Sequence, residues 1–436
     1  MNTRRLIVID RLLARPIAWG FVGAAWALGK ALRRNHHVDP DRVKTIVVAK
    51  LVGMGSIIQA TPFLTSIRRA FPNAKILFLT SIANRGLVER LECIDEGLYL
   101  RDHGLDTLSF DIATTCARFA TTGVDLYFDL ELYSAGASIL ALMSLARNRY
   151  GFYRHSARFK KGNYTHLVFF NVQMPVSRLY LQLYTAATKR SPTLPLEFGP
   201  IRVTPEDISR MRDDLAALGL GEGEPYVVVN PNASELLLER RWPADRFVAT
   251  IEELAAMGHR VVLIGSPGEA HYVRRIHEAL SPVGQHQCID SSGKLSLGSV
   301  FALIHQASCV ITNDTGPMHI AIAMSCPTVC LFGPGSPEHY GVRGRKVDIR
   351  YKAVVCSPCL YETDAPPCDG NNVCMQLIEV DEVVNAAVRL MRDEDHGTVS
   401  RRSLAPVEAP VQYMDLGGQA LGLIARASIP PRAETE

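Results

Sequence analysis

The segment CVITNDTGPMHIAIAMS, at 309–325, joins a strand-like apolar run to a group of polar residues. Asp314 or Thr315 can cap the helix that follows, and Pro317 suits its first turn because a helix start leaves N–H groups unpaired anyway. Such a start presents free backbone N–H groups and the positive end of the helix dipole. The pattern therefore predicts a site for an anion such as a diphosphate, to which His319 could donate. On spacing alone, an equally good interpretation is a well-capped helix without a ligand, in which the His319 ring is hydrogen-bonded within the protein.

A second cluster consists of four cysteines on a proline-rich loop at 356–374, spaced C-x2-C-x8-C-x5-C. Four thiolates are the ligand set of a closed, structural zinc site. The spacing is not that of a standard zinc finger, so a reduced loop or a single disulfide stays an alternative. The predicted metal ligands are Cys356, Cys359, Cys368 and Cys374.

These clusters need elements that hold them in place, and the apolar runs predict which. Continuous β-branched runs are typical of buried parallel strands, and segments with helical spacing separate them. The alternation predicts an α/β fold of two Rossmann-like, doubly wound domains that face a cleft, where ligands bind at the carboxyl ends of the strands. The predicted strands lie at 44–51, 74–81, 125–131, 226–230, 260–265, 309–314 and 327–333.

The domain boundaries follow from composition. A stretch rich in proline and glycine at 191–224 separates a first domain at 41–200 from a second at 222–395, which includes the cysteine loop. After about residue 395 the chain is rich in Pro, Ala, Ser and Arg without sustained periodicity. We expect residues 396–436 to form a disordered tail.

Composition narrows the function classes. Hydrophobic residues make up 47% and charged residues 21% of the 436, which excludes a wholly disordered chain. The net charge of +3 argues against a strongly basic nucleic-acid binder. Ten cysteines are too sparse for a disulfide scaffold, and no run has the pattern of a cleavable secretory signal, so a cytoplasmic location is expected.

The first 40 residues differ from the rest. Between Arg15 and Lys30 lie fourteen uncharged residues, too few to span a bilayer as a helix. Trp19 and Trp26 would share one helix face beside several basic residues, a mixture that suits the surface of an anionic membrane. We expect this segment to hold the protein at the inner face of the cytoplasmic membrane. The alternative is an extra helix docked on the protein.

Several longer segments of the chain resemble the motifs of a known protein family. The segment NDTGPMHIAIAMSCPTVCLFGPGSPEHYG, at 313–341, is similar to the signature of the heptosyltransferases, glycosyltransferase family 9. TIVVAKLVGMGSIIQATPFLTSIRRAFPNAKI resembles the family's opening unit, and VVVNPNASELLLERRWPADRF and VVLIGSPGE resemble the start of its nucleotide-binding domain. Several long matches in order are far more specific than a lone glycine-rich loop. The resemblance covers about 44–390 and implies the GT-B fold.

The resemblance also implies roles. Family members are inverting transferases, most of which move heptose from an ADP-sugar to lipopolysaccharide core at the inner membrane face. The donor's diphosphate would lie at Asp314, Thr315, Gly316, Pro317 and His319. Ser234 would bond a phosphate, Arg240 would face the diphosphate, and Glu269 would approach the ribose or base. Helix N–H groups with Arg240 and His319 can stabilise the leaving group, so no cofactor is expected for catalysis.

One position departs from the family. The opening loop usually reads Gly-x-Gly-Asp, with the Asp taken as general base, whereas this chain has Gly53-Met54-Gly55-Ser56. A general base contributes about 10²–10⁴ in rate, and a serine cannot replace it unaided. Glu131 is our first alternative base, because it follows a strand of the same domain. A slow transferase without a base, or a non-catalytic binder of nucleotide sugars, are the other interpretations.

The predicted function is transfer of a sugar, heptose in the first instance, from a nucleotide-diphospho-sugar to a lipopolysaccharide or related envelope glycan. Gly55, in the opening loop, belongs to the predicted substrate site. The expected partners are the donor, a lipid-linked glycan acceptor and the inner-membrane surface, and no nucleic acid is expected.

Overall fold

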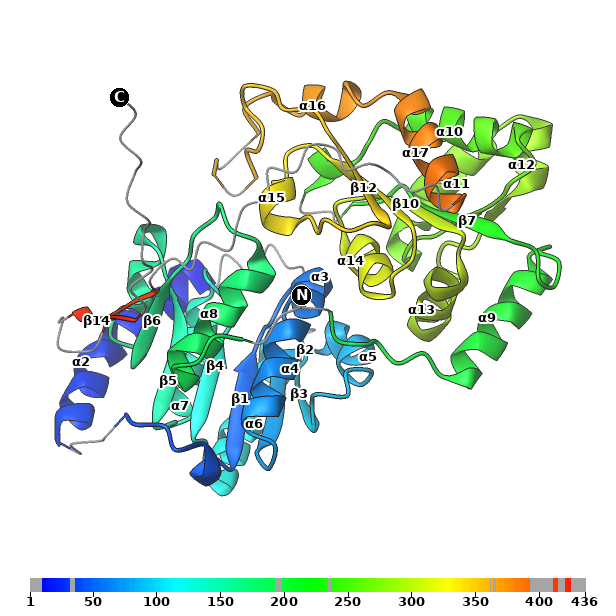
Figure 1. The fold of residues 1–436 in the computed structure, drawn as a ribbon. Coiled ribbons are helices and arrows are strands. Elements are labelled where there is room, and N and C mark those ends of the chain that lie inside the picture. Colours follow the sequence, from blue (N-terminus) through cyan, green and yellow to red (C-terminus); the bar gives the residue numbers. More distant parts are fainter. Residues whose placement is uncertain are drawn as a thin grey trace, which may run out of the picture.

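The chain forms two α/β domains, each built on its own sheet, which lie beside each other with α3 of the first next to α14 of the second (Figure 1). The structure is a computed structural model. It describes residues 10–31, 36–102, 104–192, 198–233, 237–360, 362–363, 366–392, 411–414 and 420–424. The doubly wound α/β architecture predicted from the apolar runs is confirmed.

The first domain is a sheet in the order β14-β13-β6-β5-β4-β1-β2-β3, in which β1 to β6 run parallel. Its central strand reads TIVVA and is buried along its whole length, since helices cover both faces. The strands are β1 (Thr45–Ala49), β2 (Lys75–Ser81), β3 (Glu96–Leu100), β4 (Leu126–Asp129), β5 (Asn148–Tyr153) and β6 (His166–Phe169).

The helices of this domain follow the strands at their carboxyl ends. The helical spacing after β1 gives two helices rather than one, because Pro62 stands in the first turn of a new helix. The helices are α3 (Met54–Gln59), α4 (Thr61–Ala70), α5 (Arg85–Val88), α6 (Leu105–Thr122), α7 (Ala135–Met143) and α8 (Val176–Thr188), with short turns η2 (Pro40–Arg42), η3 (Ile82–Asn84) and η4 (His155–Lys160).

The second domain has a parallel sheet in the order β12-β11-β10-β7-β8-β9. Strands β9 and β12, like β3, β5 and β6, were not identified from the sequence because they are short or only partly apolar. The strands are β7 (Tyr226–Asn230), β8 (Arg260–Leu263), β9 (Cys288–Asp290), β10 (Cys309–Asn313), β11 (Thr328–Phe332) and β12 (Val347–Tyr351).

Helices pack on both faces of the second sheet. The helix of the predicted linker, α9, packs against α13 and so belongs with this domain. The helices are α9 (Pro205–Ala217), α10 (Ala244–Ala256), α11 (Ala270–Glu278), α12 (Pro282–Gln287), α13 (Leu297–Gln306), α14 (Gly316–Ala323), α15 (Pro337–Tyr340), α16 (Val373–Gln376) and α17 (Val380–Met391), with turns η5 (Leu238–Arg240) and η6 (Pro267–Glu269).

The N-terminal segment is a helix docked on the first domain. Its first turn is η1 (Asp10–Ala14), and α2 (Arg15–Ala31) continues it along α7 and η4. The Asp10 carboxylate accepts from the backbone N–H groups of Ala135 (3.0 Å) and Gly136 (2.8 Å), and so caps α7. Among the described residues, none of the helices has the length and hydropathy to cross a bilayer.

The tail prediction needs a correction. Residues 396–436 were expected to be disordered, yet β13 (Val411–Met414) and β14 (Ala420–Ile424) form an antiparallel hairpin that pairs with β6 at Leu167. The open edge of a sheet offers unpaired backbone groups that a short strand can satisfy. Strands of four and five residues are too short for their periodicity to stand out in a biased tail. The rest of the predicted tail lies outside the described residues.

We predict that Asp10→Ala lowers the free energy of unfolding of the first domain by about 1 kcal/mol, because two N–H groups at the start of α7 lose their acceptor. Urea unfolding followed by fluorescence would measure it. The matched control is Asp41→Ala, which removes an exposed carboxylate in η2. Equal midpoints for the two variants would contradict the capping role.

Candidate functional site

The predicted anion site lies where β10 ends and α14 begins. Thr315 is the N-cap residue of α14, but its hydroxyl does not cap the helix. Instead it accepts from Asn230 Nδ2, which lies at the end of the neighbouring strand β7 (2.9 Å). The N–H groups of the first turn at Gly316 and Met318 therefore have no intrahelical acceptor, as an anion site requires. Pro317 follows in this turn, as predicted.

Arg240 lies against this loop, as expected. Its Nη1 donates to the Asp314 carbonyl (3.0 Å), and its Nε lies 3.7 Å from Asp314 Oδ2. The Asp314 side chain is only 4% exposed. A buried carboxylate would repel a diphosphate, so Asp314 serves here to hold and orient Arg240. Asp314 therefore supports Arg240 in this structure, and its own predicted contact with the diphosphate stays a prediction.

His319 is neutral, and its tautomer follows from its neighbour. Gln59 Nε2 donates to the Tyr340 carbonyl (3.0 Å) and lies 3.3 Å from His319 Nδ1. An amide nitrogen only donates, so Nδ1 accepts and the ring proton lies on Nε2. Burial lowers the pKa of His319 to about 4, although Asp314 opposes the shift. His319 is therefore a neutral N–H donor at physiological pH, rather than a cation.

The same histidine joins the two domains. Helix α3 of the first domain packs against α14 of the second (Figure 1). A Cβ on Gly55 would overlap the His319 ring, so only glycine allows this approach. Gly55, predicted as part of the substrate site, thus lies at the contact between domains, directly beside the predicted donor site.

Two further residues, Glu269 and Ser234, were predicted to contact the sugar donor, and the structure describes only Glu269. Glu269 Oε2 accepts from the Ser266 N–H (2.8 Å) and hydroxyl (2.7 Å), which closes a capping box at η6, just after β8. Its position beyond the carboxyl end of a strand suits the predicted contact with a ribose or base, but that contact stays a prediction. Ser234 lies outside the described residues.

Sequence reasoning missed two asparagines that build this site. Asn313 Nδ2 donates to the carbonyls of Pro231 and Asn232 (3.1 Å each), and its Oδ1 accepts from the Trp242 N–H (3.1 Å). Asn230 holds Thr315, as described above. Both residues stand at the end of largely apolar strands, VVVN and CVITN. A buried amide at the end of a strand needs hydrogen-bond partners, and this pattern in the sequence could have indicated their role.

Ser56 and Glu131, the predicted catalytic residues, lie beyond the carboxyl ends of β1 and β4 in the first domain. Ser56 is hydrogen-bonded to the Tyr180 hydroxyl, and burial raises the pKa of that tyrosine, helped by the charge of Glu131. Glu131 Oε1 accepts from Lys50 Nζ (2.8 Å) and from the N–H groups of Leu51 (2.8 Å) and Val52 (3.0 Å). Burial alone would favour the neutral acid, but Lys50 and the Val52 N–H outweigh it and lower the pKa of Glu131.

The neighbouring carboxylate, Asp129, belongs to a buried ion pair. Lys160 Nζ lies 2.7 Å from Asp129 Oδ2, and both side chains are fully buried. Lys160 also donates to the Glu131 carbonyl, and the Tyr164 hydroxyl donates to Asp129. Burial raises the pKa of Asp129, which Lys160 opposes. The pair holds the end of β4, and with it Glu131, in a fixed position.

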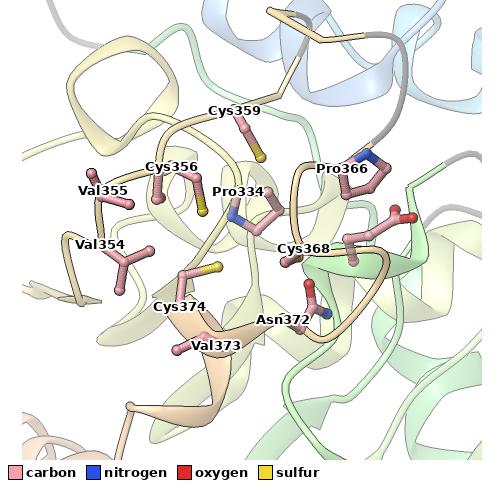
Figure 2. A pocket seen from close by; sticks show the side chains of 12 residues that line it. Pro334, Val354, Val355, Cys356, Cys359, Pro366, Cys368, Asn372, Val373 and Cys374 are labelled. Atoms are coloured by element: carbon pink, nitrogen blue, oxygen red, sulfur yellow. The ribbon is translucent and has the colours of Figure 1, made fainter.

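The four predicted metal ligands surround one cavity of about 210 Å³. Figure 2 shows Cys356, Cys359 and Cys374 with their sulfur atoms turned into it and Cys368 on the opposite side. All four are free thiols. Within the described part of the chain, no three His, Cys, Asp or Glu side chains converge closely enough, as they stand, to hold a metal ion.

The amino-acid sequence is similar to a known protein family and to curated members of it. Residues 128–368 match the model of glycosyltransferase family 9 (heptosyltransferase), which is more than half of the chain. Lipooligosaccharide heptosyltransferase 2 of Haemophilus influenzae is 35% identical over 120 residues, or 28% of this chain. That match spans 34% of the relative's own length, so the chain aligns with about a third of it.

Solved structures share the fold. A family 9 glycosyl transferase from Veillonella parvula superposes with a TM-score of 0.68 at 22% identity, covering 82% of this chain and 100% of that one. ADP-heptose lps heptosyltransferase II of E. coli superposes with a TM-score of 0.66 at 18% identity, covering 81% of this chain and 99% of that one. The solved structures show the fold, and the family model, which matches more than half of the chain, shows that this chain belongs to glycosyltransferase family 9, the heptosyltransferases.

Proposed function

We propose that this protein is an inverting glycosyltransferase that moves heptose from ADP-heptose to a lipopolysaccharide core or related envelope glycan. The observation that carries the proposal is the start of α14, where unpaired helix N–H groups lie next to Asp314, whose carbonyl accepts from Arg240, and where His319 stands in the first turns of the helix. Relatives named as lipooligosaccharide and lipopolysaccharide heptosyltransferases support the choice of sugar and acceptor.

The donor site acts on the leaving group. As the sugar departs, negative charge develops on the diphosphate, and groups already aimed at that charge lower the barrier most. The Arg240 guanidinium supplies a positive charge that Asp314 holds in place. His319, neutral with its proton on Nε2, donates without changing its own charge, and α14 adds its dipole. These groups provide the stabilisation without requiring a cofactor.

The acceptor's proton goes to Glu131 in this proposal. The pKa of Glu131 is lowered, so the side chain is a carboxylate at neutral pH. All three hydrogen-bond donors to Glu131 donate to Oε1, and they hold the carboxylate against the loop at Leu51 and Val52, which precedes Ser56. Oε2 is the atom that would accept the proton of the attacking hydroxyl. Ser56 and Tyr180 would bind the acceptor beside it.

A second candidate is a non-catalytic binder of nucleotide sugars. The specific observation in its favour is Ser56, at the position where the resemblance expects the catalytic Asp. The three donors on Glu131 also reduce its basicity, because each stabilises the charged form. Nucleotide binding without any turnover of ADP-heptose would favour this candidate.

The N-terminal helix is the proposed membrane contact. Its large apolar side chains Ile17, Trp19 and Phe21 are about half exposed, and the preceding turn exposes Leu12 and Leu13. Next to α2, η4 and the residue after it expose the basic side chains of Arg158 and Lys161. An apolar face beside positive charge matches the chemistry of an anionic bilayer surface. This contact would keep the acceptor domain at the inner leaflet, where the proposed acceptor is assembled.

We predict that Arg240→Gln raises the dissociation constant for ADP by roughly 10- to 100-fold, the magnitude of a lost charged hydrogen bond. Isothermal titration with ADP, GDP, UDP and CDP would measure both affinity and base preference. Arg210→Gln, an exposed arginine on α9, is the matched control and should bind as the wild type does. Equal affinities for the two variants would remove Arg240 from the donor site.

We predict that Glu131→Gln lowers kcat by about 10²–10⁴ with little change in KM for the donor, because the amide cannot accept the proton. The amide oxygen still accepts from the N–H groups of Leu51 and Val52, so the loop keeps its position. Glu206→Gln, at the exposed start of α9, is the control. A kcat within about threefold of wild type would assign Glu131 to positioning only, since a lost base costs far more.

We predict that the double substitution of Trp19 and Phe21 by Asp abolishes sedimentation with phosphatidylglycerol vesicles, while phosphatidylcholine vesicles bind weakly even to the wild type. The control replaces Leu105 and Phe110, which are exposed on α6 instead, by Asp. Binding that survives the first double substitution, or is lost equally in the control, would contradict the proposed contact.

A further inference from the structure

The N-terminal helix contacts the segment that carries Glu131. Asp10, in η1, accepts from the N–H groups of Ala135 and Gly136, and the Ser134 hydroxyl also donates to it (3.2 Å). Ser134 is the N-cap residue of α7 and stands three positions after Glu131. The short connection between Glu131 and α7 is therefore fixed at its far end by a residue from the start of the chain.

A second contact joins the same helix to η4. The Arg15 guanidinium lies over the Phe159 ring, 5.2 Å from its centroid. Val22 packs so closely on Gly162 that a Cβ there would lie 2.5 Å from Val22 Cγ1. Gly162 has a φ of +94°, a backbone conformation that glycine adopts most readily. These two contacts lie on either side of Lys160 in the sequence.

Lys160 connects η4 to the end of β4. Its buried Nζ pairs with the Asp129 carboxylate and also donates to the Glu131 carbonyl. Asp129 Oδ1 in turn accepts from the Glu131 N–H (2.9 Å). Both backbone polar groups of Glu131 are thus bound by this pair. The main chain at Glu131 is held through η4 on one side and through the start of α7 on the other, and the N-terminal helix contacts both.

The helix is also part of the core of the first domain. Ala18, in α2, is fully buried and belongs to the same apolar core as Leu130 and Leu132, the two neighbours of Glu131. Close-packed interiors transmit small displacements from one element to the next. A shift of α2 is therefore expected to move the end of β4.

We propose that the N-terminal helix, η1 with α2, is a positioning element for the Glu131 carboxylate. The inference rests on the proposed function, in which Glu131 takes the proton of the acceptor hydroxyl. As the hydroxyl oxygen forms its bond to the sugar and the bond from the sugar to the diphosphate breaks, that proton moves to Glu131 Oε2. Asp10 and Lys160 are positioning residues that act through Glu131. They fix where Oε2 lies, and a misplacement of about 1 Å at a reacting group lowers a rate by as much as roughly 10²-fold.

Kinetics of three variants test this role. We expect Asp10→Ala to lower kcat by about tenfold, while the KM for the donor and the dissociation constant for ADP stay within about twofold of wild type, because the donor site lies on the second domain. Asp10→Asn keeps Oδ1, the acceptor for Gly136 and Ser134, and should recover part of the loss. Val22→Ala loosens the contact with η4 and should lower kcat severalfold.

The matched control is Asp125→Ala in the same domain. Asp125 Oδ2 accepts from the N–H groups of Lys44 and Thr45 (2.7 and 3.0 Å), so this variant also leaves two backbone donors without their acceptor. Asp125 lies at the amino ends of β1 and β4, opposite the end that carries Glu131. We expect a similar loss in the free energy of unfolding with kcat unchanged. An equal fall of kcat in this control would overturn the proposal, because destabilisation alone would then explain the effect.

A double-mutant cycle tests whether Asp10 acts through Glu131. In the Glu131→Gln protein, Asp10→Ala should cause no further fall in kcat, whereas the effects of independent sites multiply. A further loss of about tenfold in this background would overturn the positioning role.

Hydrogen exchange tests the same coupling without any turnover. The Leu51 and Val52 N–H groups donate to Glu131 and belong to a different segment from the start of α7. Asp10→Ala should speed exchange at these two amides, which loss of the helix cap alone does not touch, and Asp125→Ala should leave them unchanged. Unchanged exchange at Leu51 and Val52 in Asp10→Ala would overturn the proposal. Faster exchange in a protein that does not turn over ADP-heptose would uphold the coupling of Asp10 to Glu131 and contradict only the proposed transferase function.

Discussion

The contact between Gly55 and His319 is the constraint on which the cleft depends. Because residue 55 lacks a Cβ, α3 can lie directly on α14, and the two domains meet at the start of the anion-binding helix. The same contact buries His319 and places Gln59 beside it. Burial makes the histidine neutral, and Gln59 determines which ring nitrogen carries the proton. One close approach thus sets the geometry between domains and the chemistry of the donor site.

Three buried carboxylates that follow strands of the two sheets are each paired with a basic side chain from another segment. Asp314, after β10, holds Arg240, which follows the neighbouring strand β7; Lys50 holds Glu131, and Lys160 holds Asp129. An unpaired charge at such depth would cost several kcal/mol, so these pairs keep the strand ends charged and immobile. Immobile groups need no reorganisation when charge develops on a substrate, which is the main source of electrostatic catalysis.

Segments from both ends of the chain extend the first domain at its outer side (Figure 1). Asp10 ties the N-terminal helix to the start of α7, and β13 adds to the edge strand β6. The helix uses one side to pack on the domain and leaves Ile17, Trp19 and Phe21 outward. These additions give the domain a surface of different chemistry.

The sequence by itself determined the central strands, the start of α14 directly after β10 and the family, because buried parallel strands and helix starts have local signatures in residue type and spacing. The predicted side-chain cap of α14 was wrong, because the Thr315 hydroxyl bonds to Asn230 instead. The sequence also predicted roles for Arg240, His319, Gly55 and the four cysteines, and these roles stay predictions. Only the tertiary structure showed that Asp314 supports Arg240, that His319 is neutral, that Asn230 and Asn313 hold the loop before α14, and that a hairpin forms in the tail. The physical reason is that these properties arise from contacts between residues far apart in the chain, such as Gln59 and His319, which are 260 positions apart. Charge state, tautomer and strand pairing depend on what lies nearby in space, and no local pattern encodes it.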